Sequence, residues 1–339
     1  MKARLLSLCL VAVLLFSMTS CLSFGKAEKE ENTPQAPTVN IYTLNGTTGF
    51  GMAKLMSDAK TGKTTEKYNF SVQTDASMVT SALLNGSADI AALPTNAAAN
   101  IYNKSEGGVV VLAVNTLGCL YLLTNQNATV NSFADLKGKT VYVPAQNPTF
   151  IFTYLCLQNG LKVGEDITID STTYAQPAAL KDAVAAGAVE IAVLPEPMVT
   201  IAINAAKSAN NGTVITNAMD LTAEWNKVSA EGSLVQGCVV VRRAFLEQYP
   251  EVVENFLREY KTSIEYLAAN VDSAAQMIVD NGIFTNAGVA KKALPNCNVC
   301  FLDGAAMKSA METYLGILHG IAPASIGGKL PADNFYYAK

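Results

Sequence analysis

The sequence carries two copies of one pattern, about 101 residues apart. Residues 82–94 read ALLNGSADIAALP and align with residues 183–195, which read AVAAGAVEIAVLP; six of the 13 positions are identical. Each copy predicts a helix ended by a glycine, an acidic residue, a short apolar strand and a Leu-Pro pair that opens the next segment. Upstream, residues 39–47 match residues 141–149, each as a strand, a turn and a helix start. Chance similarity of alanine-rich segments explains this order less well than a true repeat.

The repeat limits the folds open to the chain. Alternating strands and helices specify parallel sheets with right-handed crossovers, and two copies predict two similar α/β lobes. A length of 339 residues, half of them apolar, is enough for about two domains. In such sheets ligands bind beyond the carboxyl ends of the strands, so the loops after the strands are the candidates for ligand contact.

Two apolar runs indicate where the chain passes between lobes. Residues 109–124 form an almost continuous apolar run, long enough to cross from one lobe to the other, and residues 237–241 form a run that brings the chain back. Lobe 2 is therefore predicted at residues 127–233. Lobe 1 is predicted from residues 39–124 together with residues 236–339.

The amino terminus has the pattern of an export signal over residues 1–20. Two basic residues precede an apolar run at residues 5–16, which is too short to cross a bilayer as a helix. The following Met-Thr-Ser-Cys resembles the bacterial lipoprotein processing box, with Met18 in place of the usual Leu, and predicts acylation of Cys21. A core cysteine in an ordinary secretory signal is the alternative. Residues 21–38 are polar and predict a flexible tether between lipid and folded body.

Beyond the repeat, the chain resembles the substrate-binding proteins of ABC importers, in the nitrate/sulfonate/taurine and thiamine-pyrimidine-precursor branch. The resemblance covers residues 39 to about 320, and its motifs are GSADIAALP at 86–94, SFADLKGKTVYVP at 132–144, GAVEIAVLPEP at 187–197 and VRRAFLEQYPE at 241–251. It implies an α/β, two-lobed type II periplasmic-binding-protein fold, with two mixed sheets, flanking helices and a two-strand hinge.

The same resemblance implies an extracytoplasmic receptor. Such a protein captures a small organic solute between its lobes, here sulfonate-like or a pyrimidine or ring amine, and docks as a monomer on an ABC permease and its ATPase. Because the solute touches both lobes only when they are closed, binding shifts the population toward the closed state. The lipid on Cys21 implies attachment to the membrane.

Lobe 1 offers a group of candidate ligand residues after its first strand: Asn45, Gly46, Thr47, Thr48, Gly49 and Phe50. The glycines permit close backbone approach and the following helix presents free amides, although a plain strand-to-helix turn would look similar. Thr95 and Asn96 follow the repeat strand with a hydroxyl and an amide, and helix capping alone accounts for them nearly as well. Thr116, with Leu117, is predicted to form the floor of the cleft.

The matching candidates in lobe 2 are Gln146, Asn147, Thr149, Phe150 and Glu196. The Glu196 carboxylate suits a ligand with an amino or ring N–H donor; the alternative is a solvent-facing carboxylate stabilised by a helix dipole. Phe50, Phe150, Phe152 and Tyr174 offer a stacking face, or belong to the core.

The distribution of charged residues limits the classes of ligand and partner that the chain can bind. Without the leader's two basic residues, 22 Lys and Arg face 28 Asp and Glu, and there is no basic block, which argues against nucleic acid. The remaining arginines, Arg242, Arg243 and Arg258, lie away from the candidate loops, so no guanidinium clamp for an anion is evident. An anion would rely on helix amino termini.

Catalysis has little support. The one histidine, His319, is predicted near the end of an amphipathic helix and far from the candidate loops. The alternative to a receptor is an enzyme like the pyrimidine-precursor synthase on this fold, which consumes its own histidine and needs a cysteine-rich iron-binding segment. No nucleotide motif or other cofactor signature is present, and no cofactor is expected.

The cysteines carry two further predictions. Cys297 and Cys300 form a CxxC without a second pair for zinc, so in an exported protein a local disulfide is predicted. Cys119 and Cys238 each follow a glycine on the outgoing and returning runs. They are predicted on neighbouring strands at the base of the cleft, as free thiols.

Overall fold

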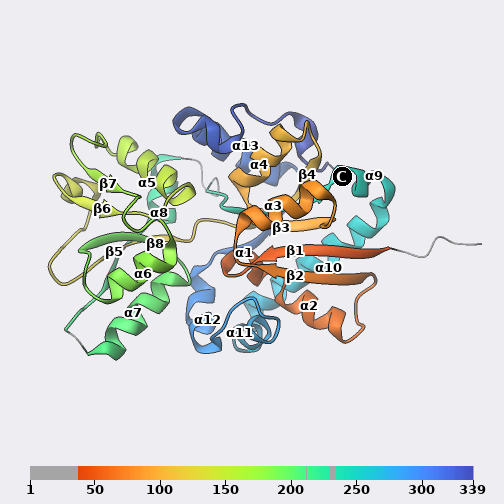
Figure 1. Ribbon diagram of the computed structural model, residues 1–339, viewed down its shortest axis with the longest axis horizontal. Coiled ribbons are helices and arrows are strands. Elements are labelled where there is room, and N and C mark those ends of the chain that lie inside the picture. The colour runs from red at the N-terminus through yellow and green to blue at the C-terminus, as the bar shows by residue number, and fades with distance from the viewer. Residues whose placement is uncertain (1–36, 211, 230–233, 339) are drawn as a thin grey trace, which may run out of the picture. The chain divides into compact units, whose positions relative to one another are not determined.

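The computed structural model describes residues 37–210, 212–229 and 234–338. The predicted export signal and Cys21 lie outside the described residues. Within them the chain forms two mixed sheets flanked by helices (Figure 1). No helix in the described part of the chain is both long and apolar enough to cross a membrane.

The larger sheet has six strands in the order β11-β4-β10-β3-β1-β2. They are β1 (Thr38–Leu44), β2 (Lys67–Gln73), β3 (Ile90–Pro94), β4 (Val109–Thr116), β10 (Gly237–Arg242) and β11 (Val299–Leu302). Strands β1, β2 and β3 run parallel, whereas β10 is antiparallel to both β3 and β4. The residues of β10 alternate between the two cores, with Cys238 and Val240 on one face and Val239 and Val241 on the other, as the two-residue period of a strand requires.

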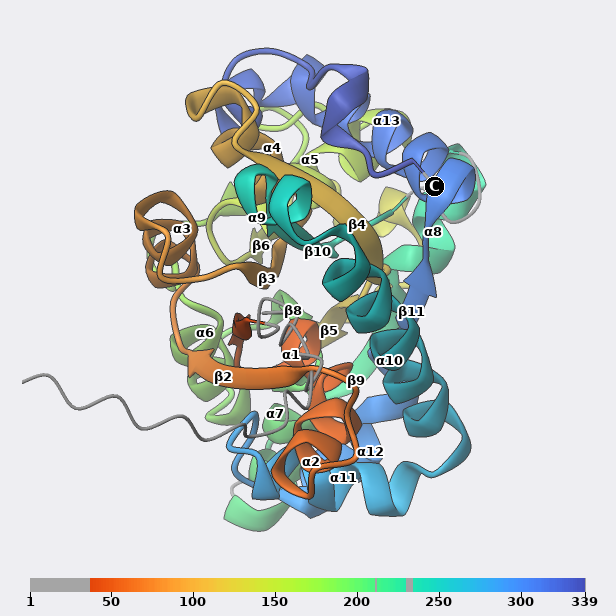
Figure 2. The same ribbon diagram turned by 90° about the vertical axis from the view of Figure 1, so that its right-hand side faces the viewer.

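Helices cover both faces of the six-stranded sheet (Figure 2). They are α1 (Thr47–Phe50), α2 (Ala53–Lys60), α3 (Ala76–Asn85), α4 (Thr95–Lys104), α9 (Arg243–Gln248), α10 (Pro250–Ala269), α11 (Val271–Asp280), α12 (Ala287–Ala293) and α13 (Gly304–Ile321). Helices α3, α4 and α13 share one core, and α2, α10, α11 and α12 share the other. The apolar stripe of α10, which includes Phe256, Tyr260 and Ile264, is buried at helical spacing.

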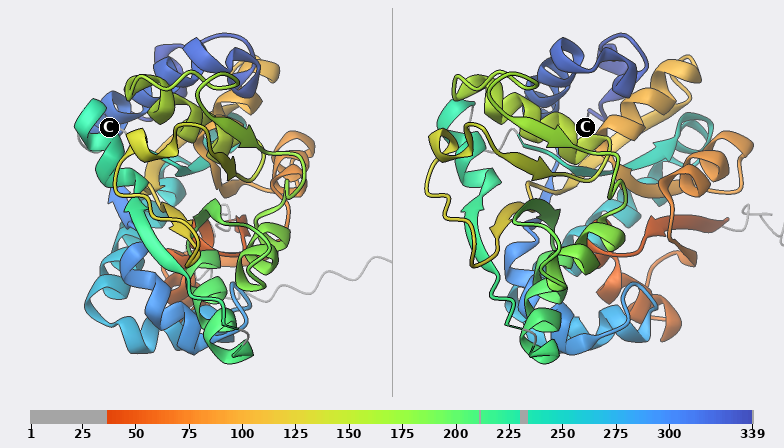
Figure 3. Two further views of the ribbon diagram at one scale, coloured as in Figure 1. Left: turned by 90° about the vertical axis from the view of Figure 1, so that its left-hand side faces the viewer. Right: turned by 60° about the vertical axis from the view of Figure 1, so that its left-hand side comes forward.

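The smaller sheet has five strands in the order β7-β6-β8-β5-β9 (Figure 3). They are β5 (Leu120–Thr124), β6 (Thr140–Tyr142), β7 (Thr168–Asp170), β8 (Ile191–Pro195) and β9 (Thr216–Asp220). Its helices are α5 (Asn147–Gln158), α6 (Pro177–Ala185), α7 (Met198–Ala209) and α8 (Leu221–Val228). Short 3-10 turns occupy Phe133–Leu136, Leu294–Asn296, Pro323–Ile326 and Asp333–Phe335.

The predicted repeat is present as a repeated sheet. Strands β2-β1-β3 in one sheet correspond to β7-β6-β8 in the other, and both sets are parallel. In each sheet the next strand is antiparallel: β10 lies beside β3, and β5 lies beside β8. Each of these strands is the first that the chain forms after passing from the other sheet.

The crossing point differs from the predicted boundary at residue 124. Residues 120–124 form β5, which pairs with β8 and β9 of the five-stranded sheet, so the chain leaves the larger sheet at residues 117–119. The prediction that Cys119 and Cys238 lie on neighbouring strands was therefore wrong. Cys119 has already left β4, the strand that pairs with β10, and comes directly before β5. Both thiols are free, as expected.

One apolar core joins the two sheets. It contains Leu93 and Val240 of the larger sheet together with Leu122 and Val193 of the smaller one. Trp225, fully buried on α8, bridges them, because its ring lies 4.8 Å from that of Tyr154 and 5.8 Å from that of Tyr314 on α13, centroid to centroid. The only tryptophan is thus a structural residue.

Candidate functional site

A cavity of about 440 Å³ is lined by residues from both sheets. The larger sheet and its loops contribute Asn45, Gly46, Thr47, Thr48, Thr74, Pro94, Thr116 and Gln236. The smaller sheet and its loops contribute Cys119, Asn147, Pro148, Gln176, Pro177, Ala178, Pro195, Glu196, Pro197 and Met198. Most of these residues follow the carboxyl ends of β1, β2, β3, β6, β7 and β8, where ligands bind in open α/β sheets.

Half of the predicted ligand residues line this cavity. They are Asn45, Gly46, Thr47, Thr48, Thr116, Asn147 and Glu196. The cavity does not include Gly49, Phe50, Thr95, Asn96, Gln146, Thr149 or Phe150. These seven follow the same strands as the residues that line the cavity, but their side chains do not line it.

Local packing explains the residues that turn away. A Cβ atom at Gly49 would lie 2.1 Å from the Leu44 carbonyl oxygen, so this glycine serves close packing of α1 on β1. Phe50 is fully buried against Phe284 in the core. The Thr149 hydroxyl donates to the Pro144 carbonyl at 2.8 Å, within its own turn.

The two helix starts that follow β1 and β6 have the same unusual backbone. Gly46 precedes α1 with φ 88° and ψ −156°, and Gln146 precedes α5 with φ 67° and ψ −126°. Positive φ is ordinary for glycine and rare for glutamine. The shared geometry indicates that these positions are structural equivalents, and they place Thr47 and Asn147 at the cavity.

Several cavity residues were missed by sequence reasoning. Gln236 comes just before the returning strand, and its Oε1 accepts the Cys119 amide at 2.6 Å, so the two crossings meet at the cavity floor. Pro148 and Pro177 lie in the first turns of α5 and α6. Proline at the start of a predicted helix marks the helix start, and this signal identifies both turns.

Hydrogen bonds connect the two sides of the cavity. The Thr47 hydroxyl donates to the Glu196 carbonyl at 2.8 Å, and the Tyr121 hydroxyl donates to the Asn296 carbonyl at 2.9 Å. Behind the cavity, the Tyr314 hydroxyl of α13 donates to Asn147 Oδ1 at 2.6 Å. These bonds join elements of the two sheets.

Glu196 is buried, with 4% of its surface exposed. Its carboxylate accepts the Thr200 amide at 3.1 Å and the Thr200 hydroxyl at 2.9 Å, in the first turn of α7. Burial raises the pKa of Glu196, while the hydrogen bonds from Thr200 and the Asn296 side chain oppose that rise. The carboxylate accepts from the first turn of α7, near the helix start, but it is buried and not solvent-facing as the alternative expected.

The five cysteines of the described residues are free thiols. The predicted disulfide between Cys297 and Cys300 is not formed: Cys297 Sγ lies 3.8 Å from the Thr47 hydroxyl, and Cys300 Sγ lies 3.9 Å from the Val114 carbonyl. Burial raises the pKa of Cys119 to about 12 and that of Cys297 well above its ordinary value. Both are therefore protonated at neutral pH.

The described part of the chain contains no cluster of three or more His, Cys, Asp and Glu side chains that could hold a metal ion. His319 lies exposed in the last turn of α13, outside the cavity.

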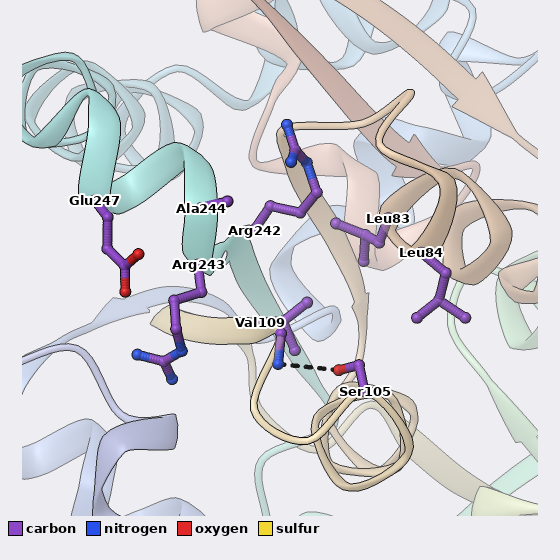
Figure 4. Close-up of a pocket in the computed structure, with 9 residues that line it drawn as sticks. Leu83, Leu84, Ser105, Val109, Arg242, Arg243, Ala244 and Glu247 are labelled. Carbon is purple, nitrogen blue, oxygen red and sulfur yellow. Dashed lines mark hydrogen bonds between the residues drawn. The ribbon is translucent and has the colours of Figure 1, made fainter.

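A second cavity, of about 330 Å³, lies at the opposite end of β10 (Figure 4). Its two arginines point away from each other. Arg242 pairs with Asp89 at 2.8 Å, and Arg243 donates to the Gly107 and Asn334 carbonyls, both at 2.6 Å. Because β10 separates this end from Gln236, neither guanidinium contributes charge to the ligand cavity.

Two lobes that share a cavity at the ends of their parallel strands define a solute-binding α/β protein. The family model described as "ABC transporter, phosphonate, periplasmic substrate-binding protein" matches residues 58–276, more than half of the chain. The chain belongs to this family of periplasmic substrate-binding proteins. A comparison with curated proteins found no match.

Solved structures of low sequence identity share the fold. An ABC transporter protein from Parabacteroides distasonis is 21% identical, with a TM-score of 0.72, covering 89% of this chain and 99% of that one. The aliphatic sulphonate binding protein SsuA from Escherichia coli is 16% identical, with a TM-score of 0.67 and coverage of 86% and 96%. The nitrate-binding protein NrtA from Synechocystis is 16% identical, with a TM-score of 0.60 and coverage of 87% and 84%. The predicted type II periplasmic-binding-protein fold is confirmed.

Proposed function

We propose that this ABC-importer receptor captures a small organic solute in the cavity between its sheets and closes around it. The observation that carries the proposal is the cavity itself, whose lining comes from both sheets at their strand ends. A solute there touches both lobes at once and favours the closed state over any open one. The loaded receptor then docks as a monomer on a permease that an ATPase drives.

Small-angle scattering tests lobe closure. The radius of gyration is measured across a panel of sulfonates, phosphonates, nitrate, pyrimidines and ring amines, alongside calorimetry on the same samples. A bound solute is expected to reduce the radius. An unchanged radius with a solute that calorimetry shows to bind contradicts the proposal.

The two lobes that move relative to each other correspond to the two sheets. Lobe 1 comprises residues 39–116 and 236–338, and lobe 2 comprises residues 120–229. This division is supported by the membership of β5 in the five-stranded sheet, which replaces the boundary expected at residue 124. Residues 117–119 and residues 234–235 form the hinge.

The receptor is held at the membrane by lipid on Cys21. The support is the signal-like residues 1–20, followed by Met-Thr-Ser-Cys and a polar tether. Cys21→Ala is expected to release the protein from membranes or leave it unprocessed. A mature amino terminus elsewhere, with no acyl mass on Cys21, contradicts the anchor.

A synthase-like enzyme is the less supported function. Its self-consumed histidine would have to reach the cavity, whereas His319 is exposed at the end of α13. His319→Ala is expected to leave solute binding unchanged, as measured by calorimetry.

A further inference from the structure

The ligand cavity has an unusual charge pattern for a family whose relatives are described as binding phosphonate, sulphonate or nitrate. Among the described residues that line it there is no Lys, Arg or His. Its one carboxyl group belongs to Glu196. An oxyanion entering this cavity would meet no positive side chain and one acidic group.

The helix amino termini at the cavity are poorly suited to replace a positive side chain. At α7 the Glu196 carboxylate already takes the Thr200 amide and places an acidic group at the position that would attract an anion. At α5 and α6, Pro148 and Pro177 lack an N–H and remove one donor from each first turn. Helix α1 has only four residues.

Four side-chain amides line the cavity, at Asn45, Asn147, Gln176 and Gln236, and in two of them the oxygen is already bonded within the protein. The Asn147 Oδ1 atom accepts the Tyr314 hydroxyl, and the Gln236 Oε1 atom accepts the Cys119 amide. These bonds fix the oxygen end of each amide and leave Asn147 Nδ2 and Gln236 Nε2, both on cavity-lining residues, without a partner among the described residues. An amide N–H₂ is a neutral donor that suits a carbonyl oxygen or a ring nitrogen.

The rest of the lining supplies apolar surface and a neutral acceptor. Five prolines, at positions 94, 148, 177, 195 and 197, stand beside Ala178 and Met198. The Thr116 hydroxyl donates to Asn115 Oδ1 at 3.1 Å, so its lone pairs can accept from a ligand N–H. Such walls suit a compact molecule with apolar faces and polar edges.

We infer that the cavity selects an uncharged solute that carries an amide or lactam group, and that it rejects small oxyanions. The carbonyl or ring nitrogen of the solute accepts from Asn147 and Gln236, and its N–H faces Thr116. This inference rests on the proposed function and specifies the solute of the same site.

The test compares two classes of probe by calorimetry and thermal shift on the folded part of the chain. The neutral probes are uracil, thymine and hydantoin; the oxyanions are methanesulfonate, methylphosphonate and nitrate. At least one neutral probe is expected to bind at millimolar concentration or below, and no oxyanion is expected to shift the melting temperature at matched ionic strength. Saturable binding of an oxyanion, without a neutral probe, overturns the inference and leaves the receptor function standing.

Conservative variants separate ligand donors from structural roles. Asn147→Asp and Gln236→Glu keep the oxygen that accepts from Tyr314 or Cys119, but each replaces the N–H₂ donor by a second acceptor. Each is expected to weaken neutral-probe binding roughly tenfold or more. Gln158→Glu, at an exposed residue at the end of α5 that does not line the cavity, adds the same charge and is expected to stay within about threefold. Equal losses in all three variants overturn the inference.

Native mass spectrometry on gently purified protein separates failure of the inference from failure of the function. A released neutral amide or lactam supports both. A released oxyanion overturns the inference alone. Failure of both probe classes, with no co-purified solute, overturns the inference and the proposed receptor role together.

Discussion

The two lobes share a backbone plan and differ in how they use it. The sets β2-β1-β3 and β7-β6-β8 have the same order and direction, yet β1 pairs with β2 over seven residues and β6 with β7 over three. The face of the larger sheet beneath α3 and α4 belongs to the core that joins the lobes. The equivalent face of the smaller sheet, beneath α6 and α7, forms a separate core.

Equivalent positions also differ in chemistry. Asp89 is buried, accepting from the Asn40 amide at 2.9 Å and from Arg242 at 2.8 Å, whereas its repeat partner Glu190 is exposed. After β3 the chain enters α4 directly, whereas after β8 two more residues, Glu196 and Pro197, precede α7. The repeated backbone therefore forms the cavity. Positions at which the two copies differ, such as Glu196, supply the contacts across the cavity.

The largest expected effect tests whether the repeated strands β3 and β8 contribute equally to the stability of the fold. Leu93→Ala and Leu194→Ala remove equivalent, fully buried side chains, and each is expected to lower the free energy of unfolding by about 3 kcal/mol. Urea denaturation is followed by circular dichroism for the whole fold and by Trp225 fluorescence, which reports on the core that joins the lobes. A small loss of unfolding free energy in only one of the two variants would show that the two strands do not contribute equally.

The acidic residues Asp89 and Glu190, which are equivalent in the repeat, should differ in their effect on stability. Asp89→Asn weakens the contacts with Arg242 and the Asn40 amide, and is expected to cost about 2 kcal/mol in unfolding free energy. Glu190→Gln, at the exposed equivalent, is expected to change stability by less than about 0.5 kcal/mol. Similar losses at both positions would show that the burial difference has no energetic consequence.

A pair of threonines distinguishes contacts between lobes from contacts within one. Thr47→Val removes the bond to the Glu196 carbonyl, worth about 1 kcal/mol, so the equilibrium ratio of closed to open molecules should fall about fivefold. Thr149→Val, in the corresponding segment after β6, removes a bond within lobe 2 and should leave closure unchanged. Single-molecule energy transfer between the lobes measures both, and equal effects would contradict the assignment.

The smallest effect concerns pH. Because burial raises the pKa of Glu196 above its unfolded value, the folded state binds more protons between those two pKa values. The contribution of this group to stability is therefore complete at low pH and declines as pH rises through that interval. Glu196→Gln lacks this decline, so the difference in unfolding free energy between variant and parent, measured by urea denaturation, should shift in favour of the variant as pH rises through that interval. A difference that does not vary with pH would contradict the buried carboxyl.

Much of the fold could be predicted from sequence because its information is local. The repeated order of a strand, a glycine-ended helix, an acidic residue and Leu-Pro identified both parallel units, and the carboxyl ends of their strands identified the loops at the cavity. The two apolar runs indicated both crossings, although the run at residues 109–124 contains two strands and conceals the break at residues 117–119.

Only the tertiary structure decided which side chains line the cavity. Whether Thr47 or Phe50 lines the cavity depends on the rotation of a four-residue helix packed on β1, and neighbouring residues in a helix point in different directions. The junction pairs Gln236 with Cys119, Asn296 with Glu196 and Tyr314 with Asn147, and the members of each pair are 100 or more residues apart in the sequence. A sequence pattern shows the periodicity within one helix or strand. The hydrogen-bond partners of these polar atoms depend instead on how separate helices and strands pack against one another.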